Sequence, residues 1–214
     1  GYTISDFIRT FAPSWFASVM GTGILAITSR SYSQYVPFLE SVSTYLFYFN
    51  MVLFVVLLNP WVLRRILFPK EAWADLEHPI LSNFYATIAI AMLVLSANFI
   101  IIGNQFLAGE IFWFLGTALT LVFGVFSPYL MIKGEHVQLH HINPAWFIPP
   151  VGLIVIPMAG SLLINRYTGL LQEVVVVLNY VGWGGGFFLY LALFAIVMYR
   201  FILHPPLPNT LAPT

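Results

Sequence analysis

Long apolar stretches alternate with short polar segments along the whole chain of 214 residues. A helix that crosses a bilayer needs roughly 20 mostly apolar residues. Six stretches come close to that length, and a spanning helix satisfies its backbone hydrogen bonds internally. We therefore expect an all-α, polytopic membrane protein in which residues 1–214 form a single transmembrane domain. The predicted spans are Phe11–Thr28, Val42–Phe68, Pro79–Ile102, Ile111–Lys133, Pro144–Ile164 and Val174–Leu203.

The composition supports a membrane protein and excludes several other classes. Hydrophobic residues make up 60% of the chain and charged residues only 7%, whereas soluble domains carry about 25% charged residues. The net charge is zero, so we expect the lipid bilayer and not a nucleic acid as a partner. The absence of cysteine excludes disulfides, thiolate catalysis, zinc–thiolate sites and iron–sulfur clusters.

The distribution of basic residues predicts the orientation. Lys and Arg concentrate in cytoplasmic loops, and six of the eight fall on one side of the predicted spans, against Arg30 and Arg166 on the other. We therefore expect a multi-pass protein of the cell (plasma or cytoplasmic) membrane with a cytoplasmic N-terminus. The six residues are Arg9, Arg64, Arg65, Lys70, Lys133 and Arg200.

An internal repeat runs through the chain. The motif Pro13-Ser-Trp15-Phe16-x4-Gly21 returns as Pro144-Ala-Trp146-Phe147-x4-Gly152, and prolines 13, 79, 144 and 208 are spaced by 66, 65 and 64 residues. A fixed period of this kind marks one supersecondary unit repeated along the chain. We interpret each unit as a transmembrane helical hairpin, over 11–68, 79–133 and 144–203, with 207–214 as the start of a further hairpin.

The two helices of each predicted hairpin differ in composition. Odd-numbered helices carry Gly and Pro, whereas even-numbered helices are rich in Phe, Leu and Val. Irregular backbone at membrane depth is tolerated only inside protein or beside a water-filled cavity. We therefore expect the odd helices to be inner, the even helices to be outer and facing lipid, and a central pore between the inner ones. Alternatively, Gly and Pro merely permit close helix packing, as the Gly182–Gly186 run in the sixth span would also do.

Several motifs resemble one family of transporters. Phe11-Ala-Pro13-Ser-Trp15-Phe16-Ala-Ser-Val-Met20-Gly21-Thr22-Gly23-Ile24 is similar to the opening of the tellurite-resistance/dicarboxylate transporter family, and His78-Pro79 and Asn143–Gly152 are similar to its later segments. That family includes malate permeases, sulfite efflux pumps and slow-type anion channels. The resemblance implies five helical hairpins around a central pore lined by odd helices, often assembled as a homo-oligomeric trimer.

The chain covers only part of that pattern. Three of the expected five hairpins lie before Thr214, and the phenylalanine with which the family plugs its pore belongs to a ninth helix. We therefore expect the chain to be a portion of a longer protein, and no gate residue is assigned to it.

The implied activity is transmembrane passage of a small anion. The sequence does not identify the anion: malate or another C4-dicarboxylate, sulfite, chloride, nitrate and tellurite are all candidates. It also does not distinguish a channel from a proton-coupled carrier. No Lys or Arg lies in the middle of an odd helix, so the path would bind anions weakly through broken helices and dipoles. We expect no enzyme and no cofactor, because the spans contain no interior Asp, Glu or His pair; a structural or receptor-like bundle is the other alternative.

Candidate pore-lining residues share one face of each odd helix, at steps of three or four. The phenylalanines among them can equally be packing residues, and Asn98 can equally join two helices by a hydrogen bond. The candidates are Phe16, Met20, Gly21 and Gly23 in the first helix, Phe84, Thr87, Ala91 and Asn98 in the third, and Phe147, Pro150, Ile154, Pro157 and Ser161 in the fifth.

Histidines give a further hypothesis. His78, His141 and His204 are spaced by 63 and 63 residues, near the start of each hairpin, and imidazole titrates near pH 6.5. They could sense pH at the cytoplasmic mouth, or simply cap helices. His136 and His140 have the i,i+4 spacing of metal ligands on a helix, but no partner ligands are evident, so we expect no metal.

Overall fold

The protein is built from helices. The computed structural model describes residues 1–78, 81–134 and 138–206, and within them it contains α-helices and short 3₁₀ helices but no β-strand. Five helical segments of this described part are long and apolar enough to cross a membrane. These observations confirm the predicted all-α, polytopic class. The five segments are Leu39–Leu67, Leu81–Ile101, Phe106–Lys133, Pro144–Arg166 and Gly169–Leu203.

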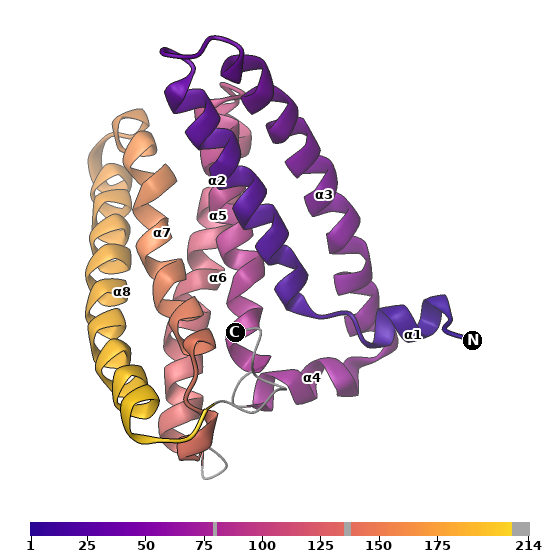
Figure 1. Cartoon of the computed structure of the whole chain (residues 1–214). Helices are drawn as coiled ribbons and strands as arrows, with labels where there is room; N and C mark the ends of the chain where they lie inside the picture. Colours follow the sequence, from indigo (N-terminus) through magenta and orange to yellow (C-terminus); the bar gives the residue numbers. More distant parts are fainter. Residues whose placement is uncertain (79–80, 135–137, 207–214) are drawn as a thin grey trace.

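The first predicted span is not among the segments that are long and apolar enough to cross a membrane. Residues Phe11–Thr28 correspond to the 3₁₀ helix η1 (Pro13–Phe16) and to α2 (Ala17–Tyr32), and this segment is not among the five. Its hydroxyl residues, together with Arg30 near its end, make it less apolar than the other spans. The prediction of six spans is thus reduced to five by length and hydropathy, although α2 packs beside the other helices (Figure 1).

Three helices of the bundle share the same length and the same kind of N-terminal extension. α2, α5 (Ala86–Ile101) and α7 (Ile148–Leu163) each have 16 residues. Each follows directly on a 3₁₀ helix: η1, η2 (Leu81–Tyr85) or η4 (Pro144–Phe147). Pro13 and Pro144 begin η1 and η4, where the fixed φ of proline suits a first helical position. Pro79 and Pro208, the other two prolines of the sequence repeat, lie outside the described residues.

Each short helix packs against the long helix that follows it. α2 packs on α3 (Leu39–Leu67), α5 on α6 (Phe106–Lys133) and α7 on α8 (Gly169–Leu203), while α5 also contacts α2 and α7 (Figure 1). Within an apolar stretch of 18 residues in each segment, 78% of the residues of Leu81–Ile101 are buried, against 17% in α3 and 17% in α8. The buried position of α5 and the exposed positions of α3 and α8 fit the expected alternation of inner and outer helices, although α5 contains neither Gly nor Pro and α8 contains the glycines of the Gly182–Gly186 run.

Glycines allow α7 and α8 to approach closely. A Cβ added at Gly182 would lie 2.7 Å from the carbonyl oxygen of Leu153, and one at Gly186 would lie 2.6 Å from that of Pro150. Both glycines therefore belong to the contact between the two helices, as predicted for this run. Gly184 and Gly185 have open space at the same position.

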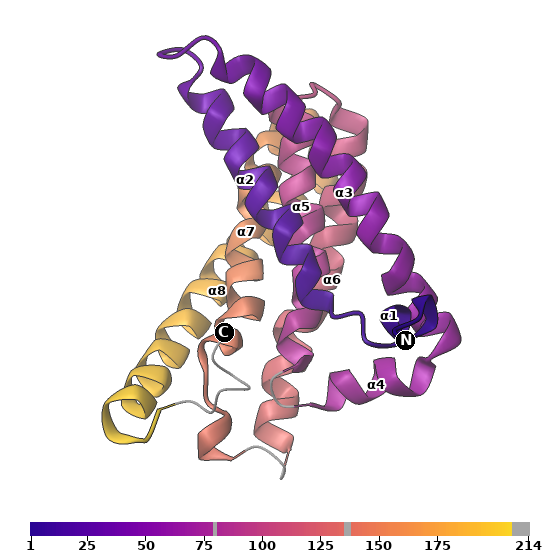
Figure 2. The ribbon, with the colours of Figure 1, turned by 45° about the vertical axis from the view of Figure 1, so that its right-hand side comes forward.

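Two further helices were not predicted from the sequence. α1 (Ile4–Arg9) and α4 (Pro69–Glu77) lie at one end of the bundle, beside the C-terminal end of α3 (Figure 2). Arg64 joins them to α3, because its Nε donates to the carbonyl oxygen of Arg9 at 2.9 Å and its guanidinium pairs with the Asp75 carboxylate. At the start of α1, a hydrogen bond from the Thr3 hydroxyl lowers the pKa of the Asp6 carboxyl.

Candidate functional site

The inner helices run in the same direction. The starts of α2, α5 and α7 all lie at the end of the bundle that carries α1 and α4, and the long helices return toward that end (Figures 1 and 2). A helix carries a partial positive charge of about half an elementary charge at its N-terminus. The N-terminal ends of α2, α5 and α7 therefore bring partial positive charge to this end, whereas the C-terminal ends of α3, α6 and α8 bring partial negative charge to the same end.

One face of α2 is open and only weakly polar. Ala17, Ser18, Gly21, Leu25 and Thr28 are exposed on it, and a Cβ added at Gly21 would meet nothing within 4 Å. The hydroxyl of Ser18 donates to the carbonyl oxygen of Trp15 at 2.6 Å, and that of Thr28 to the carbonyl oxygen of Ile24 at 2.9 Å. Since these hydroxyl hydrogens are bound to their own helix, the face offers neither charge nor strong donors.

Of the other two helices, α7 has exposed positions, whereas α5 is covered by its neighbours. On α7, Val151, Ser161 and Leu162 are exposed. On α5, a buried cluster of Ala86, Ile90 and Val94 is covered by Met20 from α2 and by Val155 and Met158 from α7, among others. Met20 was among the sequence candidates, but Val155 and Met158 were not, because an apolar residue on a helix in lipid has no distinguishing pattern.

The structure separates the sequence candidates by burial. Only Gly21 and Ser161 are exposed, and their role in a path stays a prediction. Five candidates are half-buried: Met20, Phe84, Phe147, Ile154 and Pro157. Six are buried between helices: Phe16, Gly23, Thr87, Ala91, Asn98 and Pro150.

Phe16 illustrates the buried group. Its ring is fully buried and lies 5.8 Å from the ring of Phe54 and 6.4 Å from those of Phe11 and Trp61. The ring is thus held between α2 and the outer helix α3, on the side of α2 opposite to Gly21. This placement favours the packing interpretation of Phe16. Phe147 likewise has an aromatic neighbour, Tyr190 of α8, at 5.3 Å.

Asn98 and Thr87 join the inner helices to each other. Asn98 Nδ2 donates to the carbonyl oxygen of Gly23 at 3.0 Å, and its Oδ1 accepts from Asn50 Nδ2 at 3.3 Å. The Thr87 hydroxyl lies 2.7 Å from the carbonyl oxygen of Pro13. For Asn98, the alternative of a hydrogen bond between helices is therefore the observed arrangement.

Charged side chains occupy the two ends of the bundle and leave the inner helices uncharged between them. At the end opposite α1, Arg30 pairs with Glu40 at 3.1 Å, and Arg166 with Glu110 at 2.5 Å. Beside the second pair, burial raises the pKa of the Tyr167 phenol, and the charge of Glu110 raises it further. No local pattern in the sequence indicated that Glu40 and Glu110 would pair with these arginines.

The three repeated histidines lie at helix ends. His78 Nδ1 accepts from the backbone N–H of Leu81, and His141 Nδ1 from that of Gln138, each at 3.1 Å. The His204 ring lies 5.4 Å from the Tyr199 ring at the end of α8. These contacts suit the capping interpretation. His136 is outside the described residues, and within the described part no three His, Asp or Glu side chains gather in a way that could hold a metal.

Comparison with known proteins adds the following relatives. Residues 10–214 match the family model SLAC1, described as voltage-dependent anion channel. Two uncharacterized transporters of Methanocaldococcus jannaschii are 57% and 54% identical to the chain, over 98% and 99% of its length. A sulfite efflux pump of Arthroderma benhamiae is 26% identical over 94% of the chain. The chain spans 60%, 62% and 56% of these three relatives, respectively.

Proposed function

Because this chain belongs to the voltage-dependent anion channel family, we propose that the natural protein passes small inorganic anions across a membrane. In this proposal the anion moves along the open face of α2 and the exposed positions of α7, in front of α5. Voltage alone drives the movement, so the protein acts as a channel.

The observation that carries the proposal is the parallel arrangement of α2, α5 and α7, in which Arg30 near the end of α2 is the one charged residue. Their N-terminal ends together attract an anion to one mouth of the path. No Lys, Arg, Asp or Glu lies between Ala17 and Ser29, in Ala86–Ile101, or in Ile148–Leu163. An anion would therefore be attracted at the mouth but bound only weakly inside, and conduction requires a site that an ion can leave as easily as it enters.

The same arrangement favours a singly charged inorganic anion, such as chloride, nitrate or hydrogensulfite, over a C4-dicarboxylate. Malate would bring two charges into a region where the inner helices offer no cation to compensate for lost hydration. A relative named as a sulfite efflux pump supports the inorganic class. Tellurite and C4-dicarboxylates are the alternative substrates, and both are compared with the other anions in the flux experiment.

We extend the proposal to topology and assembly. The excess of Lys and Arg at the α1 end favours a cytoplasmic N-terminus in the cell membrane. The resemblance of the motifs to the tellurite-resistance/dicarboxylate family favours a homotrimer. Crosslinking in native membranes and cysteine accessibility from each side would test both features.

A second candidate is a proton-coupled carrier in which His78, His141 and His204 respond to pH. Its support is the position of all three at helix ends on one side. The ring nitrogens of His78 and His141 that accept backbone hydrogen bonds would have to give up those bonds on protonation. The triple His→Gln variant would keep the pH dependence of wild-type flux if the channel proposal is right.

Flux in proteoliposomes tests the proposed function. The natural protein is reconstituted, and sulfite, chloride, nitrate, malate and tellurite flux is followed at set voltage with and without a pH gradient. We expect voltage alone to drive inorganic anions faster than malate. Flux that needs the pH gradient would identify the carrier, and absence of flux for every anion would contradict the proposal.

A further inference from the structure

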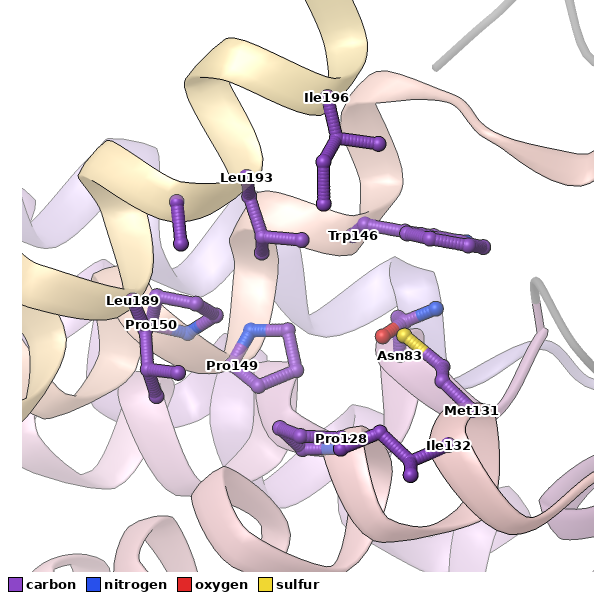
Figure 3. Close-up of a pocket in the computed structure, with 11 residues that line it drawn as sticks. Asn83, Pro128, Met131, Ile132, Trp146, Pro149, Pro150, Leu189, Leu193 and Ile196 are labelled. Atoms are coloured by element: carbon purple, nitrogen blue, oxygen red, sulfur yellow. The ribbon is translucent and has the colours of Figure 1, made fainter.

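A separate cavity lies on the side of the outer helices. It has a volume of about 300 Å³ and is enclosed by the ends of α6 and α8 and by the first turns of α7 (Figure 3). Its walls are apolar except for Asn83. They include Pro128, Met131 and Ile132 of α6, Pro149 and Pro150 of α7, and Leu189, Ala192, Leu193 and Ile196 of α8, with Trp146 at one end.

The cavity opens between two candidate membrane spans. Both α6 and α8 are candidate membrane spans, and the residues at its rim, Ile132 and Ile196, are 87% and 42% exposed. Its volume is at the lower limit of typical ligand pockets, roughly 300–1,000 Å³. Because the cavity is apolar and its walls belong to candidate membrane spans, an alkyl chain is the chemically matched occupant.

Buried hydrogen-bond donors lie at the polar end of the cavity. Trp146 is 6% exposed, and its indole N–H has no hydrogen-bond partner among the described residues. Arg200 follows Ile196 by one helical turn on the same face of α8 and is 3% exposed. Its Nη1 donates to the carbonyl oxygen of Pro205, but its Nε has no partner in the described part.

These two groups select the charge of the occupant. A buried guanidinium forms its strongest hydrogen bonds with carboxylate or phosphate oxygens, and basic sites beside membrane helices bind anionic head groups. Trp146 lines the cavity, whereas Arg200 lies behind the lining residues. Val197 is in the same buried cluster as Trp146 and lies three residues before Arg200, so Arg200 follows the lining along α8 at the Trp146 end. The apolar wall and the cationic end together match an amphiphile with a negative head.

We propose that this cavity holds one hydrocarbon chain of an anionic phospholipid, with its phosphate near Trp146 and Arg200. The site lies between outer helices and is distinct from the open face of α2. It therefore does not depend on the proposed anion passage, and lipid binding can be measured without flux.

A matched pair of substitutions tests the apolar part. Ala192 lines the cavity, whereas Ala195 is exposed on α8 outside it. Delipidated protein is incubated with phosphatidylglycerol or phosphatidylcholine, and bound lipid is counted by native mass spectrometry. We expect wild type to retain phosphatidylglycerol at least tenfold better than phosphatidylcholine. A192F should lose that retention and A195F should keep it.

Two further variants test the polar end. Trp146→Phe keeps the ring but removes the N–H, and Arg200→Gln removes the charge; both should narrow the preference for phosphatidylglycerol over phosphatidylcholine to less than threefold. Thermal unfolding without lipid identifies a variant that fails to fold. Of the two substitutions, W146F changes the side chain less than R200Q does. Equal retention of both lipids by wild type, or unchanged retention by folded A192F, would overturn the proposal.

Discussion

Asn98 of α5 donates a hydrogen bond of 3.0 Å to the carbonyl oxygen of Gly23 in α2. The Oδ1 of the same amide accepts from Asn50 of α3, so one buried side chain joins three helices. Hydrogen bonds between helices in a membrane contribute about 0.6 kcal/mol on average and up to about 1.7 kcal/mol. Asn98 thus fixes the distance between two inner helices as well as adding stability.

Replacing Gly23 by alanine tests this close contact. The new Cβ would lie 2.3 Å from Val94 Cγ1 and 2.9 Å from Asn50 Nδ2, so the helices must separate. We expect G23A to lower the free energy of unfolding by about 1–3 kcal/mol. Thermal unfolding in detergent measures it, with G184A as the control because a Cβ at Gly184 meets nothing within 4 Å. Equal melting temperatures for the two variants would argue against the contact.

Phe16→Ala distinguishes packing from a role in the path. Because the ring is enclosed by Phe11, Phe54 and Trp61, its loss should cost about 3–5 kcal/mol of stability. Phe188, which is exposed on α8, provides the control F188A with little effect. If F16A instead raised conductance at unchanged stability, the ring would narrow the path and the packing interpretation would be wrong.

Arg64 should be needed to hold the end of the bundle together. It is buried and pairs with Asp75 while binding the carbonyl oxygen of Arg9. Removing one partner of a buried ion pair typically costs about 3–5 kcal/mol, so R64Q should release α1 and α4 to proteolysis. The control is K70Q at an exposed position of α4. Identical digestion of both variants would show that the pair does not hold these helices.

The raised pKa of Tyr167 predicts that the folded protein loses stability at alkaline pH. Burial and Glu110 raise the pKa of its phenol in the folded state, whereas an unfolded tyrosine titrates near pH 10. The folded state therefore retains the proton longer. The stabilising contribution is complete below about pH 10 and is lost as the pH rises through the folded pKa. Melting temperatures from pH 8 to 11 should decline more steeply for wild type than for Y167F; parallel curves would contradict this.

The sequence predicted the class of structure better than the placement of single residues. The alternation of inner and outer helices along the repeat indicated that α5 is buried, although α5 itself contains neither Gly nor Pro. Phe16 and Met20 share a helical face by spacing, and both contribute to one cluster of α3 and α5 side chains, yet only Met20 also packs against Ala86, Ile90 and Val94 of α5. Periodicity shows that residues share a side, but not which neighbour covers each of them.

Features that depend on contacts between distant segments were also missed. α4 has nine residues and is fixed by Arg64 and by the hydroxyl of Tyr85, which donates to the carbonyl oxygen of Ala72 at 2.5 Å. An isolated helix of that length is only marginally stable in water. Its existence therefore depends on partners that no local pattern in the sequence reveals.

Anion flux through a Gly21→Phe variant tests the central claim most directly. Gly21 and Gly185 both have open space where a side chain would be placed, so either can accept phenylalanine without disturbing the packing of helices. Voltage-driven sulfite and chloride flux is compared for G21F and G185F in the same liposomes. If the open face of α2 bounds the path, G21F reduces flux at least tenfold while G185F matches wild type. Equal flux through both variants would contradict the account.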